Sequence, residues 1–117
     1  MEAKEKLEII QASADAKQGA NIQVLDISQM TTIADYFVVI SGNSAPQIDA
    51  IVDEIQDKMA EAGYELYHNE GSAHSRWVIL DYNEVIVHVF HREEREFYGL
   101  ERLWTQREEG EDEDESN

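Results

Sequence analysis

Histidine residues close together in the chain are the first candidates for chemistry. His88 and His91 stand three residues apart in the segment His-Val-Phe-His, a spacing that suggests a metal site. The apolar residues around them predict a strand, however, and residues three apart on a strand point to opposite faces. Two imidazoles placed in this way cannot bind one ion unless the strand ends between them. The sequence therefore predicts no metal site.

A turn rich in glycine and serine, Ser41–Ser44, is the second candidate. It lies between a predicted strand and a predicted helix, where backbone amides can bind a phosphate, and it resembles the turn of nucleotidyltransferases. That chemistry needs paired strand carboxylates for magnesium. In this chain Asp49 and Asp53 fall on the helix, and Asp81 is the one strong strand acid nearby. We favour a helix cap, with a magnesium-dependent enzyme using Gly42–Ser44 and Asp81 as the alternative.

A predicted hairpin holds the third group of candidates. The runs 76–81 and 85–90 flank Tyr82-Asn83-Glu84, and Asn83 is able to take the left-handed conformation of a tight turn. With a two-residue turn at 83–84, one face of the hairpin is wholly apolar or aromatic, which predicts core. It consists of Val78, Leu80, Tyr82, Val85, Val87 and Val89.

The opposite face of this hairpin mixes a large aromatic residue, an acid and an imidazole. Its predicted cross-strand pairs are Trp77 with Phe90, Ile79 with His88, and Asp81 with Ile86. This face is either a second layer of core, with Asp81 and His88 hydrogen-bonded at its edge, or a docking surface anchored by Trp77. Both interpretations stay open at this point.

The elements that must position these residues alternate between helix and strand. Their order, α-β-β-α-β-β-β-α, predicts an α/β protein of the α+β kind, with a mixed sheet flanked by helices. The expected helices are 3–18, a segment from the Ser44 capping box to Gly63, and 93–104; the expected strands are 22–27, 36–41, 65–69, 76–81 and 85–90, with a loop at 70–75.

The charge of the chain limits its partners. The 117 residues include 9 basic and 26 acidic side chains, a formal net charge of −17. Seven of the acids lie in 108–117, which holds no base, so 1–107 carries 9 basic and 19 acidic residues, or −10. Repulsion from phosphates argues against direct DNA binding and favours a basic protein partner. We expect one domain, 1–107, followed by a disordered acidic tail, 108–117.

Several kinds of site are excluded by composition. The chain has no cysteine, so disulfides, thiolate zinc sites and cysteine nucleophiles are absent, and no serine lies in a Gly-x-Ser-x-Gly turn. The first five residues have no apolar signal core, and the longest strongly apolar stretch is Tyr36–Ile40. We therefore expect no membrane span and a cytoplasmic protein.

Several blocks within residues 3–104 together resemble the Iojap family of ribosomal silencing factors. They are Ala34–Val39, Ser41–Ser44, Arg76–Tyr82, Val87–Phe90, Glu93–Tyr98 and Leu100–Trp104. The resemblance implies a nucleotidyltransferase-like core without catalysis or cofactor, usually as a homodimer. It also implies binding to large-subunit ribosomal protein fourteen, which sterically blocks joining of the small subunit and represses translation when nutrients are scarce.

The same resemblance implies a set of partner-binding residues. They are Trp77, Ile79, Asp81, Tyr82 and His88, with Glu93 and Arg95 as further members. The chain departs from the family at Asn83, where glycine is frequent, and in its acidic tail. A tail that binds basic proteins would make the chain a general acidic adaptor, which is the remaining alternative.

Overall fold

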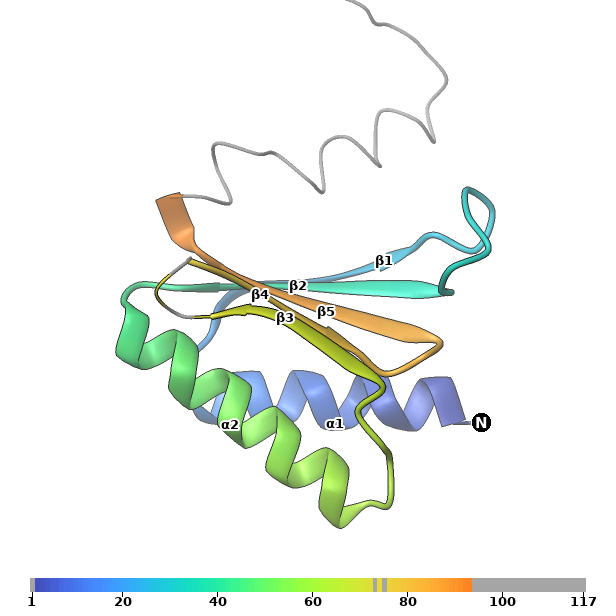
Figure 1. Ribbon diagram of the computed structural model, residues 1–117, viewed down its shortest axis with the longest axis horizontal. Coiled ribbons are helices and arrows are strands. Elements are labelled where there is room, and N and C mark those ends of the chain that lie inside the picture. The colour runs from blue at the N-terminus through green and yellow to red at the C-terminus, as the bar shows by residue number, and fades with distance from the viewer. Residues whose placement is uncertain (1, 73, 75, 94–117) are drawn as a thin grey trace, which may run out of the picture.

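A five-stranded mixed sheet with two helices packed on one of its faces forms the described part of the protein (Figure 1). The computed structural model describes residues 2–72, 74 and 76–93. In chain order the elements are α1 (Glu2–Ala16), β1 (Ala20–Asp26), β2 (Tyr36–Gly42), α2 (Ala45–Glu61), β3 (His68–Ser72), β4 (Trp77–Asp81) and β5 (Val85–His91).

The strand order across the sheet is β1-β2-β5-β4-β3. The central pair, β2 and β5, runs parallel, and the other neighbours run antiparallel. A parallel pair needs a crossover between its strands. The segment between β2 and β5 contains α2, and α1 and α2 cover the same face of the sheet (Figure 1). The mixed sheet with packed helices confirms the predicted class, whereas the expected last helix, 93–104, falls almost wholly outside the described residues.

Helix α2 begins where the sequence predicts. Ser44 is its N-cap, and the Ser44 hydroxyl accepts the Gln47 backbone N–H at 3.3 Å. The carboxamide oxygen of Gln47 accepts the Asn43 N–H at 2.6 Å, and its NH₂ group donates to the carbonyl of Gln18 at 2.8 Å. Gln47 therefore joins the start of α2 to the end of α1. The predicted apolar stripe is the buried one: Ile48, Ile51, Ile55 and Met59.

Helix α1 ends two residues earlier than predicted. The residue in the left-handed conformation after the helix is Gln18, with φ of 63°, and the Gly19 N–H donates to the Ala14 carbonyl at 2.8 Å. Packing favours glycine at position 19. A Cβ there would lie 3.0 Å from Ile40 Cγ2 and 3.1 Å from the Ala14 oxygen, so the turn packs directly on β2.

Strand β3 differs most from the sequence-based expectation. The strand covers 68–72 instead of 65–69, so three of its residues come from the predicted loop 70–75. All five of its residues are exposed, and no alternation of apolar residues marks it. Its position is set by pairing with β4, where Asn69 faces Leu80 and Ser72 faces Trp77. Tertiary pairing overrides weak local propensity in this strand.

The hairpin of β4 and β5 has the predicted register. Trp77 faces Phe90, Ile79 faces His88, and Asp81 faces Ile86. Asn83 takes a φ of 78°, as the turn requires, and the Tyr82 N–H donates to the Val85 carbonyl at 2.9 Å. The face predicted as core packs against α1 and α2. Its buried hairpin residues are Val78, Leu80, Tyr82, Val85, Val87 and Val89.

Candidate functional site

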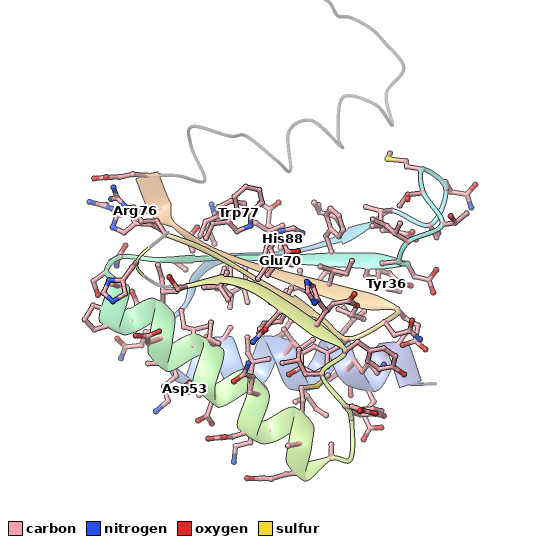
Figure 2. The ribbon with its side chains drawn as sticks, viewed as in Figure 1. Tyr36, Asp53, Glu70, Arg76, Trp77 and His88 are labelled. Atoms are coloured by element: carbon pink, nitrogen blue, oxygen red, sulfur yellow. The ribbon has the colours of Figure 1, made fainter. Side chains whose placement is uncertain are left out.

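The sheet face that points away from the helices carries most of the candidate residues. Because side chains alternate along a strand, Trp77, Ile79 and Asp81 of β4 share this face with His88 of β5. Trp77 and His88 project from the side of the sheet opposite α1 and α2 (Figure 2). A second cluster of buried apolar residues lies on the same face. It contains Ile27, Ala34, Phe37, Val39 and Phe90.

Aromatic rings pack closely in this second cluster. The Trp77 and Phe90 rings stack with centroids 4.7 Å apart, and the Phe37 and His88 rings meet edge to face at 4.6 Å. Phe90 is fully buried, whereas Trp77 and Ile79 are half-buried. The face is therefore a second layer of core at its centre, as one of the two interpretations expects, and accessible around Trp77 and Ile79.

His88 holds the Trp77 side chain in place. The indole N–H of Trp77 donates to His88 Nδ1 at 3.2 Å, so the proton of the neutral imidazole is on Nε2. The imidazole is 6 % exposed, and burial lowers the pKa of His88 to about 4. Nε2 has no hydrogen-bond partner among the described residues. His88 is thus neutral at pH 7 and acts as a hydrogen-bond acceptor for Trp77.

An open depression of about 330 Å³ lies beside Trp77, lined by Glu70, Gly71, Trp77 and Ile79. Glu70 comes from β3 (Figure 2), and the strand register places it directly opposite Ile79. Its carboxylate contacts His68 Nε2 at 3.0 Å and is otherwise open to solvent. An indole face beside an exposed carboxylate suits a guanidinium or ammonium group. The sequence prediction missed Glu70 because it placed this residue in a loop, and only the pairing of β3 with β4 brings it to Trp77.

The other predicted site residues lie at the ends of the face or away from it. Asp81 accepts the Asn83 N–H at 2.8 Å and so stabilises the hairpin turn. Glu93 pairs with Arg76 at 2.8 Å near the other end of the hairpin. Tyr82 points into the helix-side core with 1 % exposure, where burial raises its pKa to about 12. Arg95 lies outside the described residues.

The glycine-serine turn, Ser41–Ser44, caps helix α2, as the sequence predicts. The Asn43 amide, one of the donors that a phosphate would need, is bonded to Gln47, and a Cβ at Gly42 would lie 2.8 Å from Ile48 Cγ1. Asp49 and Asp53 are exposed on α2, and Asp53 points away from the sheet (Figure 2). Over residues 2–72, 74 and 76–93, no three His, Cys, Asp or Glu side chains gather in a way that could hold a metal ion.

Comparison with known proteins decides the family. The sequence model described as "Ribosomal silencing factor during starvation" matches residues 1–117. The chain belongs to this family. The silencing factor of Bacillus subtilis is 42% identical to it over 104 residues, covering 89% of this chain and 88% of that protein. The chloroplastic Iojap protein of Arabidopsis thaliana is 33% identical over 98 residues, covering 84% of this chain and 40% of that protein.

Solved structures agree with this assignment. A crystal structure of a Chromobacterium violaceum protein matches with a TM-score of 0.85 and 30% identity, covering 97% of this chain and 92% of that one. The expected Iojap relationship is confirmed. As a ribosomal silencing factor the protein represses translation and is not an enzyme, so the nucleotidyltransferase alternative is set aside. No helix in the described segments is long and apolar enough to cross a membrane.

Proposed function

We propose that this silencing factor binds large-subunit ribosomal protein fourteen through the sheet face around Trp77 and sterically blocks joining of the small subunit. The observation that supports this most directly is the half-exposed Trp77 indole, fixed by His88 beside the Glu70 depression. A rigid aromatic side chain next to a pocket has the properties of a binding hot spot. We also propose that the protein acts on ribosomes in the cytoplasm and that this binding needs no cofactor.

Charge supports a basic partner for this face. The chain carries a net charge of −17, and Glu70 places a carboxylate in the depression beside Trp77. A lysine or arginine of the partner can stack on the indole and pair with Glu70 at the same time. Ile79 and the edge of the Trp77 ring supply apolar area around this contact. We include Glu70 among the contact residues for this reason.

The remaining residues of the proposed contact set have different parts in it. Asp81 and Glu93 lie at the two ends of the hairpin, where they would meet the rim of the partner, and Arg95 follows Glu93 in the chain. Tyr82 would act indirectly, because its side chain packs behind the hairpin and keeps β4 and β5 in register. His88 likewise positions Trp77 without needing to touch the partner.

Steric occlusion requires only that a stably bound body occupy the subunit interface. A contact of standard size buries roughly 1,600 Å² in total and is sufficient when one or two aromatic anchors lie at its centre. The described domain extends over 43 × 33 × 21 Å. A body of this size cannot fit between two subunit surfaces that are in direct contact. Binding alone would therefore inhibit joining, without any chemical step.

Sedimentation of purified ribosomal subunits tests this function. We expect the full-length protein to reduce the fraction of joined ribosomes, and Trp77→Ala to lose most of this effect together with large-subunit binding. Tyr67→Ala is the matched control, because Tyr67 is an aromatic residue that is 63 % exposed and does not line the depression beside Trp77. If the wild-type protein binds the large subunit and joining is unchanged, the occlusion mechanism is wrong.

Charge reversal tests the proposed partner contact separately. Glu70→Lys should weaken binding to isolated ribosomal protein fourteen by about tenfold or more, since it replaces attraction in the depression with repulsion. Glu65→Lys makes the same charge change at an exposed position outside the depression and should have a much smaller effect. Equal losses in both variants would show that only the overall charge matters.

The free protein is proposed to be a homodimer that uses part of the same face. Half-buried Trp77 and Ile79 give this face apolar area that a second copy could cover. Dimer and ribosomal partner would then compete. Analytical ultracentrifugation should show a dimer that Trp77→Ala weakens and that added ribosomal protein fourteen converts to a heterodimer. A monomer at all concentrations would contradict the dimer without affecting the occlusion proposal.

A further inference from the structure

A groove between α1 and α2 lies on the opposite side of the protein from Trp77. Its volume is about 470 Å³, and it is lined on the α1 side by Ile9, Ala12, Ser13 and Ala16. Residues spaced by three and four positions form one stripe along a helix, so this wall is a continuous row on α1. Ala12 and Ala16 are exposed to solvent, and their small side chains leave the groove open.

The second wall of the groove is a matching row on α2, formed by Glu54, Lys58, Glu61 and Ala62. Both helices cover the same face of the sheet, so the groove runs between two neighbouring helices of one layer (Figure 1). Two adjacent rows of this kind form a site into which the side chains of a third helix can pack. Helix-in-groove binding is a common mode of recognition and uses such rows.

Ser13 is the polar residue of the α1 wall of the groove. The residue is 3 % exposed, and its hydroxyl oxygen is not a buried atom without a hydrogen-bond partner, since among the described residues only His88 Nε2 is one. Because Ser13 lines the groove, a polar group of a bound ligand could form a hydrogen bond with its hydroxyl.

The acidic side chains in and near the groove favour a basic ligand. Lys58 pairs with Glu61 at 3.7 Å, whereas half-buried Glu54 has no cationic partner in the described segments. One turn before Ile9 on α1, the Glu5 carboxylate accepts a hydrogen bond from the Tyr64 hydroxyl near the end of α2. The groove and its end are thus net acidic. A basic partner therefore suits this groove better than a second copy of this chain, whose net charge is −17.

We propose that this groove binds a basic amphipathic helix of a partner protein. The small apolar side chains of that helix would pack on Ala12 and Ala16, and a polar side chain would bond the Ser13 hydroxyl. Its lysine or arginine residues would lie beside Glu54 and Glu61. This site is separate from the sheet face around Trp77, so the silencing factor could hold a second basic protein while docked on the ribosome.

Peptide binding to the full chain tests this proposal. The probe is a synthetic amphipathic helix with alanine and leucine on one face and lysine on the other, followed by fluorescence anisotropy at low salt. The comparison peptide replaces every lysine with glutamate. We expect the lysine peptide to bind at least about tenfold more tightly than the glutamate peptide. Absence of binding of the lysine peptide would overturn the proposal.

Variants show whether the peptide binds in the groove. Ala12→Trp fills the groove and should weaken binding about tenfold or more, as should Glu54→Lys combined with Glu61→Lys. The matched control combines Asp49→Lys with Asp53→Lys, the same charge change on exposed positions of α2 that do not line the groove. Ser13→Ala should weaken binding several-fold, with no loss of thermal stability.

The results distinguish peptide binding in the groove from general electrostatic attraction and from self-association of the chain. Equal losses in the groove variants and the Asp49/Asp53 control would reduce the effect to general electrostatics and overturn the proposal. A wild-type dimer that Ala12→Trp dissociates would also overturn it, since the occupant would then be a second copy. Trp77→Ala should leave peptide binding unchanged, so failure of the groove proposal and failure of the proposed ribosome contact are distinguishable.

Discussion

The indole of Trp77 is held by a histidine that stays neutral near pH 7. His88 accepts the Trp77 N–H through Nδ1, is almost fully buried, and has a pKa lowered to about 4 by desolvation. Protonation would place a buried charge in an aromatic cluster and turn Nδ1 from an acceptor into a donor. The geometry of the proposed anchor therefore depends on the protonation state of one ring.

Replacing His88 should make stability less dependent on pH. Because the folded pKa lies below the ordinary value of 6.5, the unfolded chain binds the proton more readily. The neutral ring thus contributes stability that is complete above pH 6.5 and is lost as the pH falls towards 4. Between pH 7 and pH 5 this loss amounts to about 2 kcal/mol. Urea unfolding should show it for the wild type and not for His88→Phe.

The interval from pH 7 to pH 5 separates His88 from the carboxylates. Asp26, bonded to Ser28, and Glu84, bonded to Lys6, both have lowered pKa values and titrate below this interval. Their contributions to stability disappear only at more acidic pH. An equal fall in the stability of wild type and His88→Phe would show that the His88 imidazole is not the group that titrates in this interval.

At the scale of elements, local patterns predicted most of the fold. The apolar stripe of α2 and the capping box at Ser44 were sufficient to place that helix, and Asn83 was sufficient to give the register of the β4–β5 hairpin. Strand β3 could not be placed in this way, because its five exposed residues have no apolar pattern and its position depends on pairing with β4. Glu70, the acid beside Trp77, was missed for the same reason.

The junction of α1 with the sheet leads to a second prediction. Gly19→Ala should lower the free energy of unfolding by about 1–3 kcal/mol, because the new Cβ would lie within 3.1 Å of both Ile40 and the Ala14 carbonyl. Gly63→Ala is the comparison. It has a φ of +88° with no atom within 4 Å of the new Cβ, so only backbone strain of about 1 kcal/mol applies. Chemical denaturation of both variants would test this order.

A buried lysine connects α1 to the hairpin. Lys6 is 4 % exposed and donates to the Glu84 carboxylate at 2.6 Å and to the Tyr82 carbonyl at 2.7 Å. This contact, made over a long sequence separation, was not predicted, because nothing in the local pattern distinguishes Lys6 from a solvated lysine. It fixes the N-terminal helix against the turn that sets the register of the proposed docking face.

Replacing Glu84 and replacing Lys6 should lower the free energy of unfolding by different amounts. Glu84→Met leaves a buried ammonium group without its counter-charge and should cost about 3 kcal/mol or more. Lys6→Met leaves a carboxylate that is 29 % exposed and can be hydrated, so the cost should be smaller. Thermal unfolding of both single variants and the double variant measures this asymmetry. Equal losses in the two single variants would contradict the asymmetry, and losses that simply add in the double variant would show that the pair contributes little.

For the whole molecule, two features of the sequence act on different steps of binding. In the proposed complex, the net charge of −17 would produce a long-range attraction to a basic ribosomal protein and accelerate encounter. The proposed aromatic anchor at Trp77 would act only after contact, by slowing dissociation. Sequence composition alone predicted the first feature. The second required the structure, because the sequence left open whether Trp77 was core or surface.

Salt should therefore change the association rate and leave the dissociation rate nearly constant. The Debye length is about 10 Å at 0.1 M salt and about 3 Å at 1 M, so raising salt over this range should slow association with ribosomal protein fourteen by roughly tenfold or more. Trp77→Ala should show the opposite pattern, with faster dissociation and a similar association rate. Removing residues 108–117 lowers the net charge from −17 to −10 and should flatten the salt dependence without abolishing binding. If that truncation abolished binding, the contact would lie in the acidic tail, and the sheet face would not be the docking surface.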